Sequence, residues 1–458
     1  MTDNLTTGFV AEAMERRGYV VQRGPDRPVT GGAADSRNVR EGDLFTAFPG
    51  ENADGNRFVA DALRNGAVAA ICERAPEGDW PGKTIVIAPD ATLAVGELAR
   101  EWRRTWGGPV VGITGTVGKT TAKELIAAAL ASRFETHKSE GNFNSRQGLP
   151  LAIMSLRRSH EVSVLEMGMD SAGEIAYLCN IAEPAVGVVL NIGLTHVSKL
   201  GSIEAIAAEK LSLAQSLPLS GTAVLNADDG RVAAGISGLR CNVLSFGRNQ
   251  RADIRAEAIE SRGLFGTAFR AHFGEQTADV QSPLPGEHVV PAALAALGVC
   301  MALGLRFEDA AAAVSAAQTS GHMRVLHLDR DITLIDDRYN ASPASVRGAL
   351  EMLSRLDGRR LALLGRMAEL GDFEEAEHRE AGRVAAASCD VLVTVGPVCL
   401  ALAAAAREAG HRDVRWFETK EAAAEDLARE LRAGDTILVK ASRGEAFETI
   451  LPKLGVAE

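Results

Sequence analysis

The sequence predicts an α/β protein of three domains: a small mixed α/β N-terminal domain, a central parallel-sheet domain with a phosphate loop (P-loop), and a C-terminal Rossmann-like domain. The chain has 458 residues, and a domain commonly takes about 150. Short β-branched runs alternate with helical stretches, as in parallel sheets covered by helices. A Gly-Lys-Thr-Thr turn at residues 118–121 joins one such strand to a helix.

The predicted N-terminal domain spans residues 1–107. Apolar runs at Leu44–Phe48, Val68–Cys72 and Thr84–Ala88 are separated by Gly, Pro, Asp and Asn clusters, which is typical of strands joined by turns. The segment Trp102–Pro109 ends in Gly-Gly-Pro and predicts a domain boundary.

The predicted central domain spans residues 108–325. Helical patterns from Thr120 to about Ser132 and from Glu204 to Leu217 lie between strand candidates. This alternation favours a mainly parallel sheet with helices on both faces. The strand candidates are Val110–Thr114, Val162–Leu165, Val186–Leu190 and Thr222–Leu225.

The predicted C-terminal domain, residues 326–458, repeats that rhythm. Five strand candidates separated by helical segments predict a Rossmann-like sheet. They are Ile332–Ile335, Leu361–Leu364, Val391–Val395, Val414–Phe417 and Thr436–Val439.

Composition excludes several classes of protein. Acidic residues outnumber basic ones, 60 to 49, for a net charge of −11, which disfavours nucleic-acid binding. The six cysteines form no C-x-x-C pair, so neither a zinc site nor a disulfide scaffold is indicated. The N-terminus lacks a secretion signal, and the uncharged stretches around 289–305 and 391–406 fall short of the ~20 apolar residues of a membrane span. We therefore expect a cytoplasmic protein.

Residues 112–121, Gly-Ile-Thr-Gly-Thr-Val-Gly-Lys-Thr-Thr, predict a phosphate-binding loop. Backbone N–H groups and a helix N-terminus would face an anion, a lysine would neutralise the β/γ-phosphates and a threonine hydroxyl could ligate Mg²⁺. Ile113 stands five positions before Gly118, where the standard phosphate-loop pattern has a glycine. The alternative interpretation is a glycine-rich turn with an exposed lysine. The loop alone does not separate kinases, motors and ligases. Its nucleotide-binding candidates are Thr114, Gly115, Thr116, Val117, Gly118, Lys119, Thr120 and Thr121.

Further motifs in the same order resemble the Mur ligase family. The loop resembles its T-G-x-x-G-K-T-T form, and the MurF-type branch is indicated by Asp336–Pro343, by Leu364–Gly371 with His378, and by Lys440–Gly444. The other matching segments are Asp35–Arg37, Gly42–Phe45, Gly141–Asn144, Glu166–Gly168, Asn191–His196 and Ala208–Lys210.

The resemblance implies a ligase that uses ATP and Mg²⁺. It implies that D-alanyl-D-alanine is added to UDP-N-acetylmuramoyl-tripeptide through an acyl phosphate, during synthesis of peptidoglycan precursors. The N-terminal domain would bind the UDP-sugar peptide, the central domain ATP, and the C-terminal domain the dipeptide. The expected partners are these small molecules, with no nucleic acid and no membrane span, and the expected state is a monomer.

The resemblance and the residue chemistry together select the candidate catalytic and metal-binding residues. Glu166 ends a strand candidate, where a carboxylate beside a phosphate loop is placed to hold Mg²⁺ with Thr120; a solvated loop glutamate is the alternative. His196 is a metal ligand only by resemblance, since Mg²⁺ prefers oxygen. By resemblance, Lys210 is carbamylated and positions Mg²⁺, whereas a solvated helix lysine is the plain alternative. The catalytic set is Lys119, His196, Lys210 and Arg324.

Two further candidates lie at the junction with the C-terminal domain. Arg324 could reach the γ-phosphate when the domains close, and Asp337, just after a strand, could reach a ribose. A surface arginine and a turn aspartate are the alternatives. The substrate-binding candidates, carried by resemblance, are Ser36, Arg37, Asn142, Asn144, Asn340, Ser342 and Arg443.

Four positions depart from the family pattern. Ala292 stands where asparagine is usual near the adenine, Ser171 replaces a histidine, Arg366 replaces an acid, and Arg338 replaces a small residue. The phosphate and magnesium residues are retained, so the departures leave the acceptor open. A paralogue joining another amino acid or dipeptide, and a non-catalytic nucleotide-binding paralogue, are the alternatives.

Overall fold

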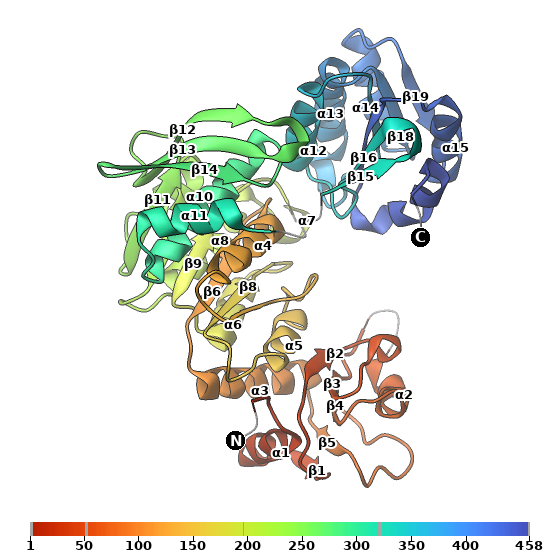
Figure 1. Ribbon diagram of the computed structural model, residues 1–458. Coiled ribbons are helices and arrows are strands. Elements are labelled where there is room, and N and C mark those ends of the chain that lie inside the picture. The colour runs from red at the N-terminus through yellow and green to blue at the C-terminus, as the bar shows by residue number, and fades with distance from the viewer. Residues whose placement is uncertain (1–2, 51–53, 196, 319–322, 457–458) are drawn as a thin grey trace.

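Three sheets rich in parallel strands follow one another along the chain in the computed structural model (Figure 1). The structure describes residues 3–50, 54–195, 197–318 and 323–456. In Figure 1 the N-terminal domain lies at the bottom, the central domain in the middle and the C-terminal domain at the upper right. The predicted α/β fold of three domains is confirmed. None of the helices in these ranges has the length and apolar composition that crossing a membrane requires.

The N-terminal sheet has the strand order β1-β5-β4-β3-β2. Strands β2 to β5 are parallel, and β1 joins the edge antiparallel to β5. Predicted strands correspond to β3, β4 and β5, whereas β1 and β2, with three residues each, were too short to be predicted. The elements are α1 (Thr7–Arg16), β1 (Val20–Gln22), β2 (Gly31–Ala33), β3 (Asp43–Thr46), α2 (Val59–Arg64), β4 (Ala69–Cys72), β5 (Thr84–Ile87) and α3 (Ala91–Trp106).

The central sheet has the order β14-β13-β12-β11-β10-β9-β6-β8-β7. The phosphate-loop strand β6 lies inside it, paired in parallel with β8 and β9, so its carboxyl end lies between those of two neighbours. Strands β7 to β12 run parallel, whereas β12, β13 and β14 form an unpredicted antiparallel meander. The strands are β6 (Val110–Thr114), β7 (Thr136–Lys138), β8 (Val162–Glu166), β9 (Val186–Val189), β10 (Thr222–Asn226), β11 (Asn242–Gly247), β12 (Ile254–Ser261), β13 (Thr267–Phe273) and β14 (Gln276–Ser282).

Helices cover both faces of this sheet, as predicted. One face packs on α4, α10 and α11, and the other on α5, α6 and α8. The uncharged stretch near residue 290 is the buried helix α10. The helices are α4 (Lys119–Leu130), α5 (Gly148–Met154), α6 (Glu174–Ala182), α7 (Val197–Leu200), α8 (Ile203–Gln215), α9 (Gly230–Ala234), α10 (Val290–Ala302) and α11 (Phe307–Ala316), with the 3-10 turns η3 (Gly263–Phe265) and η4 (Glu287–Val289).

The C-terminal sheet has the order β15-β16-β20-β17-β18-β19. The five predicted strands are parallel, and the unpredicted β15 is added antiparallel to β16. The main elements are β15 (Arg324–Leu328), β16 (Ile332–Asp336), α12 (Pro343–Ser354), β17 (Arg360–Leu364), η6 (Gly371–Phe373), α13 (Glu374–Ser388), β18 (Val391–Val395), α14 (Cys399–Glu408), β19 (Val414–Phe417), α15 (Lys420–Glu430), β20 (Thr436–Lys440), η7 (Arg443–Glu445) and η8 (Phe447–Leu454).

Helix α3 joins the N-terminal domain to the central domain. It packs on α5 and α6, and one apolar cluster contains side chains from both domains. The buried Trp102 donates its indole N–H to the Leu156 carbonyl, 3.0 Å away. Arg103, also buried, donates to the carbonyls of Ala182 and Glu183 at 2.6 and 3.0 Å. Ala182 is the last residue of α6 and Glu183 follows it, and carbonyls at a helix end have no partner within the helix. The predicted boundary segment is thus helical up to Trp106.

The C-terminal domain meets the central domain where α12 packs on η4, and Figure 1 shows α12 on the side of the C-terminal domain that faces the central domain. Gly348 of α12 lies against His288, and an added Cβ at this position would be 2.9 Å from the histidine Cβ. The Glu287 carboxylate pairs with Arg355 of the C-terminal domain and with Arg248 of the central domain. Close backbone approach and ion pairs therefore bring the two domains together beside the phosphate loop.

Candidate active site

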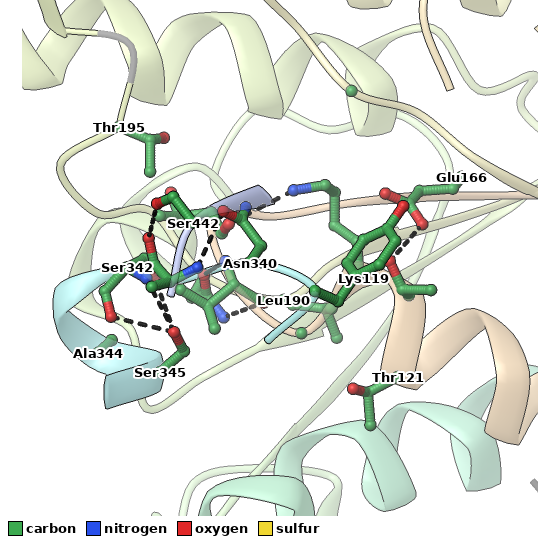
Figure 2. Close-up of a pocket in the computed structure, with 18 of the residues that line it drawn as sticks. Lys119, Thr121, Glu166, Leu190, Thr195, Asn340, Ser342, Ala344, Ser345 and Ser442 are labelled. Atoms are coloured by element: carbon green, nitrogen blue, oxygen red, sulfur yellow. Dashed lines mark hydrogen bonds between the residues drawn. The ribbon is translucent and has the colours of Figure 1, made fainter. Parts of the chain in front are cut away.

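A cavity of about 620 Å³ lies between the central and C-terminal domains. The central domain contributes the phosphate loop and the ends of β8 and β9, and the C-terminal domain contributes the segments that follow β16, β17 and β20. Figure 2 shows Lys119, Thr121 and Glu166 on one side and Asn340, Ser342 and Ser442 on the other. In parallel sheets, ligands commonly bind outside the carboxyl ends of the strands, and this cavity has that position.

The predicted phosphate loop forms a strand–turn–helix unit. Strand β6 ends at Thr114, and α4 begins at Lys119 after Gly118, whose φ of +84° lies in the left-handed region that favours glycine. The Lys119 ammonium donates to the carbonyls of Gly115 and Thr116 at 2.9 and 3.4 Å. Desolvation lowers the pKa of Lys119, while the carboxylates of Glu166 and Glu369 act in the opposite direction. The loop residues from Thr116 to Thr121 line the cavity.

Glu166 lies at the end of β8 and is 3% exposed. Its carboxylate accepts hydrogen bonds from the Thr120 hydroxyl and from the Asn144 amide, both at 2.8 Å. A hydroxyl, a carboxylate and an amide therefore meet beside the phosphate loop, and oxygen donors of this kind suit Mg²⁺. In the described part of the chain, no cluster of three or more His, Cys, Asp or Glu side chains could hold a metal alone. The arrangement fits an ion that is held partly by nucleotide phosphates.

Lys210, in helix α8, is 2% exposed and lines the cavity. Its ammonium donates to the Gly115 carbonyl at 3.1 Å, so it shares this acceptor with Lys119. Burial places the pKa of Lys210 well below its usual value; the nearby Lys119 charge lowers it further, and Glu209 partly opposes the shift. The environment therefore favours the neutral amine, which is the form that reacts with CO₂. A solvated helix lysine, the plain alternative, is wrong.

Asn191 supports the phosphate loop from the neighbouring strand. Its side-chain oxygen accepts from the Val117 N–H and its amide donates to the Val117 carbonyl, both at 2.9 Å. The Thr116 hydroxyl accepts from the Gly193 N–H at 2.8 Å. The sequence motif contained Asn191, but nothing in it indicated a hydrogen-bond partner 74 residues away.

Replacing Asn191 with alanine is expected to loosen the loop. The Val117 N–H and carbonyl would lose their partners, which costs about 1–3 kcal/mol of stability, and we expect a several-fold higher KM for ATP. Thermal unfolding and ATP kinetics measure the two effects. Asn242→Ala is the matched control, because the amide of this residue also bonds to a backbone carbonyl, at 3.2 Å, without lining the cavity. An unchanged KM for ATP in Asn191→Ala would contradict the supporting role.

The C-terminal wall of the cavity is built around Lys440, which is 2% exposed. Its ammonium donates to the Asp337 carboxylate at 2.6 Å and to the Asn340 carbonyl at 3.0 Å. The Arg443 guanidinium lies over the Tyr339 ring, 5.5 Å from its centre. Lys440 therefore fixes the loop that carries Asp337 and Asn340. Long-range contacts of this kind are why Lys440 and Tyr339 were absent from the predicted site.

The structure brings most of the predicted site residues together. Asn142, Asn144, Asp337, Asn340, Ser342 and Arg443 line the cavity along with Lys119, Thr120, Glu166 and Lys210. Arg324 begins β15 and is exposed, one residue beyond Met323 of the cavity wall. His196 lies outside the described residues. Cavity residues that were not predicted include Glu369, Asp170, Glu174, His288 and Ser442.

The two N-terminal candidates lie apart from the cavity lining. Ser36 is buried and begins a 3-10 turn over Ser36–Asn38. The next residue, Arg37, is exposed, and its guanidinium pairs with Asp35 at 2.6 Å. Neither lines the cavity, so any role of theirs concerns a separate part of a substrate.

The four residues that differ from the family pattern lie in different environments. Ala292 lines the cavity. The Arg366 guanidinium is 2.7 Å from the Glu374 carboxylate, and that of Arg338 is 2.9 Å from Asp336. The backbone N–H of Ser171 donates to Glu174. Ala292 is thus the one of the four that a bound ligand would touch directly.

The fold and the site define a three-domain phosphate-loop enzyme whose cavity opens between two domains. Family models match along the chain: "Mur ligase family, catalytic domain" at residues 28–103, "Mur ligase middle domain" at 113–300 and "Mur ligase, glutamate ligase domain" at 321–443. The chain belongs to the Mur ligase family.

Curated relatives match nearly the whole chain. The UDP-N-acetylmuramoyl-tripeptide–D-alanyl-D-alanine ligase of Bacillus subtilis is 33% identical over 93% of each chain. The Escherichia coli enzyme of the same name is 32% identical, over 94% of this chain and 95% of its own.

Solved structures agree with these relatives. MurF from Acinetobacter baumannii has a TM-score of 0.86, with 29% identity over 99% of both chains. MurF from Thermotoga maritima, solved in complex with ADP, has a TM-score of 0.79 and 29% identity, over 93% of this chain and 97% of its own.

Proposed function

We propose that this protein is an ATP-dependent ligase that joins D-alanyl-D-alanine to UDP-N-acetylmuramoyl-tripeptide and so completes a peptidoglycan precursor. The observation that carries the proposal is the cavity, in which a phosphate loop faces the C-terminal loops that bear the branch-specific motifs. The near full-length match to relatives of that name supports it.

Each domain has a part in this reaction. Residues 1–107, with Ser36 and Arg37, bind the UDP-sugar peptide. Residues 108–325 bind ATP, as the ADP complex of the Thermotoga maritima relative supports. Residues 326–458 bind the dipeptide through Asn340, Ser342 and Arg443, while Asp337 reaches the ribose. The enzyme works in the cytoplasm as a monomer.

The reaction transfers the γ-phosphoryl group to the terminal carboxylate of the tripeptide. The bond to the β-phosphate breaks, ADP leaves and an acyl phosphate forms. The dipeptide ammonium loses one proton to water, and the resulting amine attacks the acyl carbon. The amide bond forms, the bond from the acyl carbon to the phosphate oxygen breaks, and phosphate leaves with the second proton of the nitrogen. Lys119 and Arg324 stabilise the charge on the transferring group. Burial of the cavity between two domains shields the acyl phosphate from water.

Thr120, Glu166, His196 and a carbamylated Lys210 are the residues that would hold Mg²⁺. Bound Mg²⁺ supplies positive charge to the phosphate oxygens. Glu166 accepts from Thr120 and Asn144, so these side chains lie together beside the phosphate loop. The buried, readily deprotonated Lys210 supports carbamylation, which would convert a cation into an oxygen donor.

A coupled assay tests the proposal. The protein, ATP, Mg²⁺ and the tripeptide nucleotide are incubated with and without D-alanyl-D-alanine, and phosphate release and product mass are measured. A pentapeptide product that depends on the dipeptide is expected. Phosphate release without ligation would instead indicate a paralogue with another acceptor, for which the cavity residue Ala292 is the first position to vary. ATP binding without turnover would indicate a non-catalytic protein.

A further inference from the structure

The loop between β17 and η6 projects a carboxylate into the active-site cavity. Glu369 lines the cavity and is exposed there, while its neighbours Met367 and Leu370 are 1% and 2% exposed. Lys119 of the phosphate loop lines the same cavity. The carboxylate and the phosphate loop therefore belong to one cavity.

The backbone at Glu369 has a conformation that ordinary residues avoid. Its φ is +66°, in the left-handed region that favours glycine. Among the described residues, six other than glycine have positive φ, and Glu369 alone of these lines the cavity. Strain of this kind persists only where the surroundings enforce it, and it commonly marks a functional site.

Hydrogen bonds on both sides hold the loop in place. The Met367 N–H donates to the ring of the fully buried His378 at 3.0 Å, and the Ala368 N–H donates to the Ser442 hydroxyl at 2.9 Å. The Ser442 N–H in turn donates to the Arg366 carbonyl at 3.0 Å. The loop is thus fixed to the same segment that carries Arg443, and the carboxylate position is set by the domain rather than by a flexible tip.

Other charged groups also line the C-terminal wall. The Asp337 carboxylate is neutralised by the buried Lys440 at 2.6 Å. Arg443 is exposed and lies over Tyr339. One wall therefore offers a guanidinium and a carboxylate to the same cavity. A zwitterionic peptide has one group of each sign at its two ends, and each would meet an opposite charge here.

We infer that Glu369 is a specificity-determining residue that binds the ammonium group of the incoming dipeptide, with Arg443 receiving the carboxylate at its other end. This inference rests on the proposed function and adds the recognition of the acceptor. Binding the ammonium in the cavity that the phosphate loop lines brings its nitrogen towards the carboxyl group that the phosphoryl group activates, and loss of one proton to water then gives the attacking amine. The strained backbone at Glu369 costs free energy, and the surrounding structure offsets that cost to hold the carboxylate in the cavity.

Steady-state kinetics of the full-length enzyme test the inference. In Glu369→Gln, we expect the KM for D-alanyl-D-alanine to rise tenfold or more, because a charge-assisted hydrogen bond is lost. The KM for ATP should stay within about twofold. Propionyl-D-alanine, which lacks the amine, serves as a competitive inhibitor, and its Ki should be the same in both proteins. Glu448→Gln is the matched control, since that acid of the same domain pairs with Arg338 at 3.4 Å and does not line the cavity.

A second variant separates recognition from folding. Glu369→Gly removes the side chain and relieves the positive φ, so its melting temperature should equal or exceed that of the wild type while the KM for the dipeptide rises. A lower melting temperature in Glu369→Gly, or a parallel rise in the Ki of propionyl-D-alanine in Glu369→Gln, would show a structural role and overturn the inference. An unchanged dipeptide KM would also overturn it and leave the proposed ligase intact. A wild-type protein that fails to use the dipeptide would overturn the proposed function itself.

Discussion

Lys119→Ala is expected to lower kcat/KM for ATP by a factor of about 10²–10³ or more, the size of effect seen when one group that stabilises a transition-state charge is removed. The Lys119 ammonium lies at the start of α4 and bonds to two carbonyls of its own loop. A phosphate arriving at the loop would take the place of those carbonyls as the partner of the ammonium. Lys119 is the first residue of α4, the helix that follows the phosphate loop.

Phosphate release and product mass measure the effect of Lys119→Ala. Folding should be retained, because alanine is a good helix former and the bonds that are lost lie within one loop. Lys138→Ala is the control: this lysine is in the same domain, pairs with Glu124 and does not line the cavity. If Lys119→Ala turned over ATP at the wild-type rate, the loop would not be the phosphate site.

Lys210→Arg is expected to reduce ligation by a comparable factor. Arginine keeps the positive charge but cannot be deprotonated, so it cannot form a carbamate. Because burial lowers the pKa of Lys210 well below its usual value, the neutral amine that reacts with CO₂ is more available than in a solvated lysine, and its share falls as the pH is lowered. Activity should therefore decline towards acidic pH and in buffer stripped of CO₂, and bicarbonate should restore it.

NMR with ¹³C-labelled bicarbonate provides a readout independent of activity. A carbamate signal is expected in the wild type and should be absent from Lys210→Arg. Lys210→Met controls for folding, since an apolar side chain at a site that is 2% exposed should keep or raise the melting temperature. Full activity of Lys210→Met, or wild-type activity that is indifferent to CO₂, would remove the carbamate from the mechanism.

Most strands inside the sheets were predicted from the sequence, although β11, which lies between β10 and β12, was not. Val110–Thr114 matches β6 residue for residue, and Val391–Val395 matches β18, because strands buried on both faces are continuous apolar runs. The meander of β12 to β14 was missed, since many of its side chains are exposed and polar. Edge strands β1, β2 and β15 are short or partly exposed and gave no such run.

Site residues, like strands, were predicted where a local sequence pattern indicates them and missed where it does not. Residues within a local motif, such as Lys119, Thr120 and Glu166, were predicted and lie together in the cavity. Asn191 and Glu369 lie within segments that resemble the family motifs. The role of Asn191 depends on a contact with a distant segment, and that of Glu369 depends on a backbone angle. The spacing of residues along the sequence indicates neither these distant contacts nor the backbone angle. Arg324, predicted from its place at a domain junction, lies next to the cavity wall rather than on it.

The apolar cluster that α3 shares with α5 and α6 has a consequence for how the chain unfolds. Elements that pack into a common core unfold cooperatively. Here α3 shares its apolar cluster with the central domain, and Arg103 adds hydrogen bonds across the same boundary. We therefore expect the first two domains to behave as one cooperative calorimetric unit. The C-terminal domain has its own apolar clusters on both faces of its sheet, so it should melt as a second unit.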